Sequence, residues 1–291
     1  MSSILITGAT GNVGVEVIRY LYQIGTSNRI VAGVRNIEKA KKILSDFTNL
    51  EFARFDFEDP DTFDNALSGI DKVFLLRPPH ISDVEKYFVP LITAIKHNSI
   101  NEIVFLSVQG AEKSKIIPHN KIERLLNEYG LESIFLRPSY FMQNLTTTLI
   151  CDIKTKREIV LPSGKAKFNW VDIENIAEAG AMLLEKFADY KNQSYEITGY
   201  ENLSFAQVTS QINKVIENPI HYRSVNPLKF FQIKRREGMG KGLIMVMILL
   251  HFLPRFQKEP KISNFYEQLT GKKPTDLVTF IKREKTQFEK Q

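Results

Sequence analysis

The feature that most limits how this chain can fold is a glycine-rich turn that directly follows its first apolar segment. The sequence ILITGATGNVG places Gly8, Gly11 and Gly14 between a predicted strand and a predicted helix. In that setting the glycines allow a tight turn, a close approach of backbone to a pyrophosphate, and close packing of helix on strand. The free amides and positive dipole end of the helix favour an anion. The residues that we expect to hold the phosphates are Gly8, Thr10, Gly11, Asn12, Val13 and Gly14.

The first half of the chain alternates short aliphatic or β-branched runs with helical patterns. The predicted strands are Ile4–Thr7, Arg29–Val34, Leu50–Phe55, Lys72–Leu76, Glu102–Ser107 and Glu132–Leu136. The predicted helices are Val13–Ile24, Ile37–Phe47, Asp61–Leu67, Asp83–Asn98 and Asn120–Tyr129. This spacing predicts an α/β fold with a doubly wound parallel sheet of the Rossmann type. We expect a dinucleotide-binding domain over residues 1–140, and a smaller, mainly helical α/β substrate lobe over residues 141–291 that is packed on it and not fully separate.

Composition narrows the classes of partner and compartment. The formal net charge is +6, but the lysines are spread along the chain instead of forming a dense block, so we expect no nucleic-acid partner. The single cysteine, Cys151, and the lack of a signal-peptide pattern favour the cytoplasm. The apolar run Gly242–Pro254 is too short to span a bilayer and predicts a buried helix or a pocket lid. We expect no metal site.

The end of the second predicted strand indicates which nicotinamide dinucleotide the chain prefers. A site that selects NAD carries an acidic residue there, which holds the ribose 2′-hydroxyl. Here the strand ends at Arg35, and a guanidinium can pair with a 2′-phosphate that a carboxylate would repel. Lys39, one helical turn further on, adds a second positive charge. We therefore expect NADP(H) in preference to NAD(H); the alternative is that both are solvated surface residues.

The ends of the other predicted strands supply the rest of the expected cofactor groove, because ligands of open α/β sheets bind outside the carboxyl ends of the strands. Asp56 and Phe57 follow the third strand, where an adenine ring would rest. Asp56 either accepts a hydrogen bond from the adenine amino group or caps the next helix. The groove-lining residues at the fourth and fifth strand ends are Leu76, Arg77, Ser107, Val108 and Gln109.

Several longer motifs run through the rest of the chain. They are VRN at Val34, LSVQGAE at Leu106, LRPSYFMQNL at Leu136, NWVDIENIAEA at Asn169, ITGYENLSFAQV at Ile197 and LTGKKPTDLVTFI at Leu269. Together with the glycine turn they resemble the NmrA-like branch of the atypical short-chain dehydrogenases/reductases, which includes NAD(P)H-dependent quinone oxidoreductases and azoreductase-like proteins. The resemblance implies that Pro138, Tyr140 and Phe141 lie at the nicotinamide ring. The alternative is a buried corner with an aromatic core stripe.

The chain departs from short-chain reductases at their acid/base pair. No Tyr-x-x-x-Lys occurs in the sequence. Where the helix that carries this pair should begin, the chain reads IIPHNKIERLL, so His119 becomes a candidate proton donor and Lys121 a candidate ligand of the nicotinamide ribose. The alternative is that both are ordinary surface residues. We count His119, Lys121 and Tyr140 as catalytic candidates, and Ser107 keeps at most a hydrogen-bonding role.

Two functions follow from this combination. The first is an enzyme that passes hydride from NADPH to an electron-poor small molecule such as a quinone, which needs little acid catalysis. The second is a regulatory protein that senses NADP(H) and presents a changed surface to a protein partner. A nucleotide-sugar epimerase ranks last, since that chemistry also requires the tyrosine pair.

Overall fold

The computed structural model describes residues 2–289, which form two compact units that are each built from separate stretches of the chain. Unit 1 comprises Met1–Pro138, Ile173–Ile197 and Phe265–Lys272. Unit 2 comprises Ser139–Asp172, Thr198–Asn264 and Lys273–Gln291. The first crossing between units lies two residues from the boundary expected at residue 140. The two later returns to unit 1, however, differ from the contiguous division expected from the sequence.

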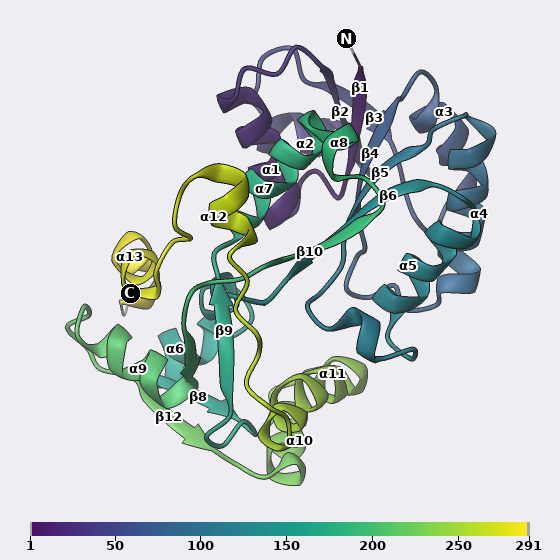
Figure 1. The fold of residues 1–291 in the computed structure, drawn as a ribbon. Helices are drawn as coiled ribbons and strands as arrows, with labels where there is room; N and C mark the ends of the chain where they lie inside the picture. The colour runs from purple at the N-terminus through teal and green to yellow at the C-terminus, as the bar shows by residue number, and fades with distance from the viewer. Residues whose placement is uncertain (1, 290–291) are drawn as a thin grey trace. The chain divides into compact units, whose positions relative to one another are not determined.

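Unit 1 is built on a seven-stranded parallel sheet in the order β10-β6-β5-β4-β1-β2-β3 (Figure 1). Its strands are β1 (Ser3–Thr7), β2 (Arg29–Val34), β3 (Glu51–Arg54), β4 (Lys72–Leu76), β5 (Glu102–Leu106), β6 (Glu132–Pro138) and β10 (Gln193–Ile197). The central strands are buried on both faces, which explains their near-continuous aliphatic sequences. The predicted doubly wound parallel sheet is confirmed.

Helices cover both faces of this sheet (Figure 1). On one face lie α1 (Asn12–Gln23), α2 (Ile37–Ile43) and α7 (Ile173–Glu185). On the other lie α3 (Phe63–Leu67), which follows the 3-10 turn Pro60–Thr62, α4 (Val84–His97) and α5 (Pro118–Glu128). A further 3-10 turn, Ala111–Lys113, precedes α5, and the short helix α8 (Phe187–Tyr190) follows α7. Helix α1 buries Val13, Val17 and Leu21, which share one face at helical spacing.

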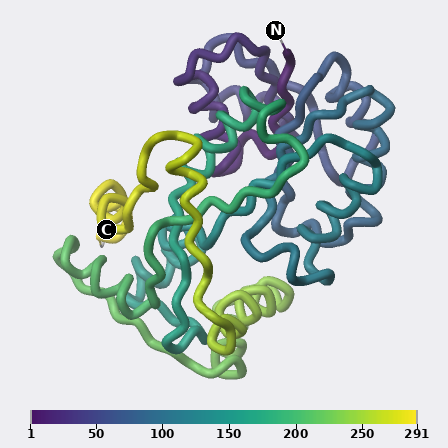
Figure 2. The backbone as a smooth tube through the Cα atoms, viewed as in Figure 1, coloured from purple at the N-terminus to yellow at the C-terminus, as the bar shows by residue number. Residues whose placement is uncertain are grey.

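The sequence did not predict a seventh strand in this sheet, nor that the helix before that strand would pack in the same unit. β10 pairs in parallel with β6, from Gln193 opposite Ile134 to Ile197 opposite Pro138. α7 is buried almost all round and packs against α1. The later segment α12 (Phe265–Thr270) packs against α7 and β10, and Figure 2 traces these green and yellow returns of the chain. In the sequence, residues of unit 2 lie between the first six strands and each of these two returns to unit 1. The regular alternation of strands and helices that identifies βαβ units is therefore interrupted before β10 and before α12.

Unit 2 contains two small sheets and several helices. The first sheet has the strand order β11 (Asn202–Ser204), β9 (Lys167–Val171) and β7 (Tyr140–Phe141). The second sheet pairs β12 (His221–Ser224) with β8 (Glu158–Leu161). Its helices are α6 (Ile150–Lys156), α9 (Phe205–Asn213), α10 (Pro227–Arg236), α11 (Lys241–Phe252), α13 (Leu277–Arg283) and α14 (Lys285–Phe288), with 3-10 turns at Met142–Leu145 and Leu253–Phe256. Among residues 2–289, no helix is both long and apolar enough to cross a membrane.

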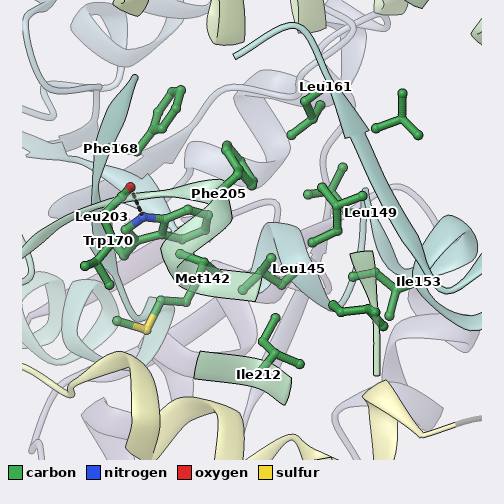
Figure 3. Close-up of a cluster of buried hydrophobic side chains, with 14 of the residues drawn as sticks. Met142, Leu145, Leu149, Ile153, Leu161, Phe168, Trp170, Leu203, Phe205 and Ile212 are labelled. Carbon is green, nitrogen blue, oxygen red and sulfur yellow. Dashed lines mark hydrogen bonds between the residues drawn. The ribbon is translucent and has the colours of Figure 1, made fainter. Parts of the chain in front are cut away.

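An aromatic cluster forms the centre of unit 2. Figure 3 shows the indole of Trp170 between Met142 and Phe205, with its Nε1 donating a hydrogen bond to the carbonyl oxygen of Leu203 at 3.0 Å. The rings of Trp170 and Phe205 meet edge to face, with centroids 5.1 Å apart. Trp170 is thus a core residue whose only polar atom is satisfied.

Candidate nucleotide-binding site

The glycine turn lies at the carboxyl edge of the sheet, between β1 and α1. Gly8 adopts a left-handed conformation with φ of +60°, which L side chains rarely adopt. A Cβ atom on Gly14 would lie 2.4 Å from the carbonyl oxygen of Gly8 and 2.8 Å from the Cα of Ala9. Gly14 therefore has no room for a side chain, because α1 packs directly against the turn.

The N-terminus of α1 is open to a ligand. Gly11 is the N-cap, so no side chain caps the helix, and the first turn contains no acidic residue. The amide of Gly11 donates to the carbonyl oxygen of Gly8 at 2.9 Å, which fixes the turn. The uncapped amides and the helix dipole favour an anion at this point. Thr10 and Asn12, predicted to contact the phosphates, flank Gly11 in this turn, and the buried Val13 follows in the first turn of α1.

Arg35 follows β2 directly and is exposed. β2 is the immediate neighbour of β1 in the parallel sheet, so Arg35 and the glycine turn follow the same ends of adjacent strands. Among the described residues, the guanidinium has no hydrogen-bond or ion-pair partner. Lys39 is also exposed; its backbone amide donates to Asn36, the N-cap of α2, while its ammonium group is unpaired within the same residues. Both cations are therefore available to a ligand.

Asp56 and Phe57 follow β3 but differ in accessibility. The Asp56 carboxylate accepts from the backbone amide of Glu58 at 3.0 Å and so closes a local turn; Asp59 is the N-cap of the following 3-10 turn. Phe57 is only 5% exposed, and its ring lies edge-on to Phe55 with centroids 5.0 Å apart. The Phe57 side chain therefore belongs to the hydrophobic core, which counts against the predicted place of this side chain at an adenine ring.

The end of β4 is joined to the glycine turn. The Thr7 hydroxyl accepts from the amide of Leu76 at 2.8 Å, and the Cβ of Leu76 lies 3.4 Å from the place where a Cβ of Gly8 would be. Arg77 turns its guanidinium to the carbonyl oxygens of Pro78 and Ile81, at 3.0 and 2.5 Å, which holds the loop after β4. Burial lowers the pKa of Arg77. Leu76 is thus packed against the glycine turn, while Arg77 is committed to its own loop.

At the end of β5, Ser107 belongs to a buried polar network that sequence reasoning did not predict. The Ser107 hydroxyl donates to the Glu123 carboxylate at 2.5 Å. Arg137 donates to the same carboxylate from Nε and Nη2, at 2.9 and 2.6 Å, and pairs with Glu112 at 3.0 Å. Burial opposes the charge of Arg137, but the bonds and charges of Glu123 and Glu112 outweigh it and raise the pKa of Arg137. The network joins β5, α5 and β6.

A sequence signal for this network did exist. Glu123 falls on the face of α5 that also carries Ile122 and Leu126, and all three are buried. Arg137 follows the buried apolar run 134–136 of β6. A carboxylate and a guanidinium on apolar faces are seldom buried unless they are paired. Nearby, Val108 is half-buried and Gln109 donates to Glu196 at 3.1 Å.

His119 and Lys121, the catalytic candidates of α5, lie in different environments. Burial, with a smaller contribution from Arg77, lowers the pKa of His119 to about 3. Its Nε2 accepts from Arg77 Nε at 3.4 Å, which requires the neutral ring. His119 as a proton donor at neutral pH stays a prediction, and this lowered pKa counts against it. Lys121 is exposed, so its ammonium is accessible for the predicted contact with a ribose.

Pro138 ends β6 as a buried residue, whereas Tyr140 and Phe141 form β7 in unit 2. The Tyr140 hydroxyl lies 3.0 Å from Nε2 of His251, whose Nδ1 lies 2.7 Å from the carbonyl oxygen of Met247. Since only a protonated Nδ1 can bond a carbonyl, the Tyr140 hydroxyl is the donor to His251. Burial raises the pKa of Tyr140 and lowers that of His251 to about 4. Within unit 2, Tyr140 is packed like a core aromatic residue.

The whole arrangement matches a known family. The sequence model of the NmrA-like family matches residues 1–281 of the 291. The chain belongs to the NmrA-like family. The match includes every strand of unit 1, so the open glycine turn and its flanking strand ends are part of the family fold.

Individual NmrA-like relatives span nearly the same length. Prestalk A differentiation protein A of Dictyostelium discoideum is 29% identical over 96% of this chain and 91% of its own. An NAD(P)H azoreductase of Xenophilus azovorans is 27% identical over 98% of this chain and 99% of its own.

Solved structures share the fold of this NmrA-like chain. The triphenylmethane reductase of Citrobacter sp., complexed with NADP(H), superposes with a TM-score of 0.85 at 21% identity, covering 96% of this chain and 99% of that one. An NADPH-dependent quinone oxidoreductase of Escherichia coli, complexed with NADPH, gives a TM-score of 0.83 at 22% identity, covering 96% and 99%.

Proposed function

We propose that this NmrA-like protein is an NADPH-dependent reductase that passes hydride to an electron-poor small molecule, with a quinone as the preferred acceptor. The observation that carries the proposal is the uncapped N-terminus of α1 at Gly11 beside the unpaired guanidinium of Arg35. One end of this arrangement suits a diphosphate and the other suits a 2′-phosphate. The names of the azoreductase and quinone oxidoreductase relatives support the same reading.

Each part of the site has a role in this proposal. The backbone of Gly8–Gly14 would bind the pyrophosphate, and Arg35 and Lys39 would bind the 2′-phosphate. Leu76 would form part of the wall of the cofactor groove. When bound, the reduced nicotinamide supplies a hydride. Lys121 would reach the ribose, and the ends of β5 and β6, at Ser107–Gln109 and Pro138, would flank the ring. Positioning of the two reactants supplies most of the rate enhancement.

The hydrogen bonds of the hydroxyl groups and the neutral charge of the imidazole support a hydride acceptor that needs no strong proton donor from the protein. Ser107 already donates its one hydrogen bond to Glu123, and Tyr140 donates its one hydrogen bond to His251. With its pKa lowered to about 3, His119 is neutral at pH 7. A quinone accepts hydride and then takes a proton from solvent, whereas a simple ketone demands a proton donor as the alkoxide forms. Simple ketones should therefore be poor substrates.

The proposal is tested by following NADPH oxidation after menadione is added. Gly11→Asp should abolish binding and turnover, because it puts a carboxylate where the diphosphate binds. Gly11 has φ −85° and ψ 167°, and Asp is a preferred N-cap residue, so the variant should remain folded after the small shift required by a Cβ 3.2 Å from the Gly8 carbonyl oxygen. Gly240→Asp is the matched control, since Gly240 is the N-cap of α11 and has open space around it. Turnover that survives in Gly11→Asp would overturn the proposal.

The second candidate is a sensor of NADP(H) without significant turnover. The same hydrogen bonds favour it, because a chain without a free proton donor is also what a binding protein would have. A developmental protein among the relatives points in this direction. Calorimetry would distinguish the two functions: saturable NADPH binding, with no oxidation across quinones, azo dyes and triphenylmethane dyes, would identify the sensor.

A further inference from the structure

Helix α11 is apolar on both of its sides. Its inner side, formed by Ile244, Met247, Ile248 and His251, is buried against the core of unit 2. A surface helix normally presents polar residues on the side opposite the core. From Leu243 to Leu250, however, every residue of α11 is aliphatic or methionine, and the outer side therefore has no polar side chain.

The outer side of α11 is exposed to solvent over its whole length. We call it the outer face, and it comprises Leu243, Met245, Val246, Leu249, Leu250 and Leu253, which are 46 to 59% exposed. At 100° per residue these positions fill the half of the helix opposite the buried residues. Phe256, in the next turn, is 73% exposed. Contiguous exposed apolar surface of this kind marks an interaction site.

The net charge of the chain is concentrated around this face. Residues 227–262, from α10 to just beyond the 3-10 turn after α11, contain eight Lys and Arg but only two Asp and Glu. Their excess of six positive charges equals the formal net charge of +6 of the whole chain, so the other 255 residues are balanced. The two acidic residues, Glu237 and Glu259, are each paired with a lysine. The positive charge is thus segregated onto the segment that carries the outer face.

The cations flank α11 at both ends. Lys241 begins the helix, and Arg255 and Lys258 follow it. The preceding helix, α10, packs against α11 (Figure 1) and ends in Arg235 and Arg236. Within residues 2–289, the side chains of Arg236, Lys241 and Lys258 have no ion-pair partner. These charges are free to attract an external anionic surface.

We propose that the α10–α11 segment docks the protein on an anionic lipid surface, with the outer face entering the interface and the flanking cations binding lipid headgroups. Twelve residues of helix are about 18 Å long, too short for the roughly 30 Å hydrocarbon core, so α11 lies along the interface. A second copy of the chain is a poorer occupant, because a two-fold contact through this face would oppose two strongly positive segments. The inference goes beyond the proposed function and does not depend on it.

Flotation of the protein with vesicles tests this docking. Vesicles of phosphatidylcholine with about 30% phosphatidylglycerol should bind the protein, and pure phosphatidylcholine vesicles should bind it much less. Val246→Glu combined with Leu250→Glu should abolish binding; both side chains are about half exposed, so folding should be retained. The matched control is Ile43→Glu combined with Ile116→Glu, which also adds two acids at exposed apolar positions. Arg236→Gln and Lys258→Gln should each weaken binding about fivefold.

Several outcomes would overturn the proposal. One is the absence of binding to anionic vesicles at low salt. Another is equal, salt-independent binding to neutral vesicles, which would remove the role of the cations. A third is a dimer in solution, detected by light scattering, that Val246→Glu with Leu250→Glu dissociates. NADPH binding by calorimetry should be unchanged in all these variants, so failure of the docking and failure of the cofactor site are distinguishable.

Discussion

The hydroxyl of Ser107 donates a hydrogen bond to the buried carboxylate of Glu123 at 2.5 Å. A serine hydroxyl carries one proton, so toward any ligand Ser107 can only accept a hydrogen bond. The bond to Glu123 therefore bears directly on which acceptors this protein can reduce.

Ser107→Ala should lower stability without stopping quinone reduction. Loss of a hydrogen bond to a buried carboxylate should cost about 1.5–3 kcal/mol, measured by urea unfolding. At saturating NADPH, kcat with menadione should stay within about threefold of wild type. Ser133→Ala is the control, because its buried hydroxyl bonds only a neutral carbonyl and should cost about 1 kcal/mol. A loss of kcat of about a hundredfold would instead assign Ser107 a role as an acid catalyst.

Arg35→Asp should discriminate between the two nicotinamide dinucleotides. The substitution replaces a cation by an anion at the proposed 2′-phosphate site, so NADPH should bind roughly 10- to 100-fold more weakly while NADH changes little. Calorimetry with both dinucleotides measures the effect. Arg236→Asp, at an exposed arginine of unit 2, should alter neither affinity. Equal weakening for NADPH and NADH would show that Arg35 does not bind the 2′-phosphate.

Two glycine-to-alanine changes in helices should have opposite signs. Gly14→Ala puts a Cβ 2.4 Å from the Gly8 carbonyl oxygen, so the turn must move, and stability should fall by about 1–3 kcal/mol. Gly242→Ala adds a Cβ in open space within α11 and should stabilise the protein by up to about 1 kcal/mol. Thermal unfolding of both variants provides the comparison. A neutral Gly14→Ala would mean that α1 does not pack on the turn as described.

His251 should make stability depend on pH. Its pKa is about 4 in the folded protein and about 6.5 in the unfolded chain, so the unfolded state binds more protons between these values. Stability due to this group is full above pH 6.5 and is lost as the pH falls toward 4. His251→Phe should remove about 1.4 kcal/mol per pH unit from the slope in that range. His97→Phe, at an exposed histidine, should leave the slope unchanged, and an unchanged slope in His251→Phe would contradict the buried pair.

The local features of unit 1 were predictable from the sequence. The helix expected over Val13–Ile24 is observed over Asn12–Gln23, and the strand expected over Arg29–Val34 has those bounds. These elements are specified by apolar periodicity and by glycines at turns, which are properties of neighbouring residues.

Properties set by distant residues were not predictable in the same way. From the sequence, Phe57 was predicted to lie at a strand end that is accessible to a ligand. In the structure its side chain is buried, because its ring packs against Phe55 and against Phe88 in α4. Ser107 and Glu123 are 16 positions apart, and Tyr140 and His251 are 111 positions apart. Only the folded chain places such partners together and thereby fixes which group donates each hydrogen bond.

The returns of the chain to unit 1 also affect how the protein can be made. A ribosome-bound chain that ends before Gln193 lacks β10, which leaves the edge of β6 unpaired. Because α12 comes from Phe265–Thr270, synthesis must proceed through Lys272 before this unit is complete. Neither unit can be obtained by a single cut in the gene, and a nascent chain that ends before Gln193 exposes the edge of β6 to pairing with other chains.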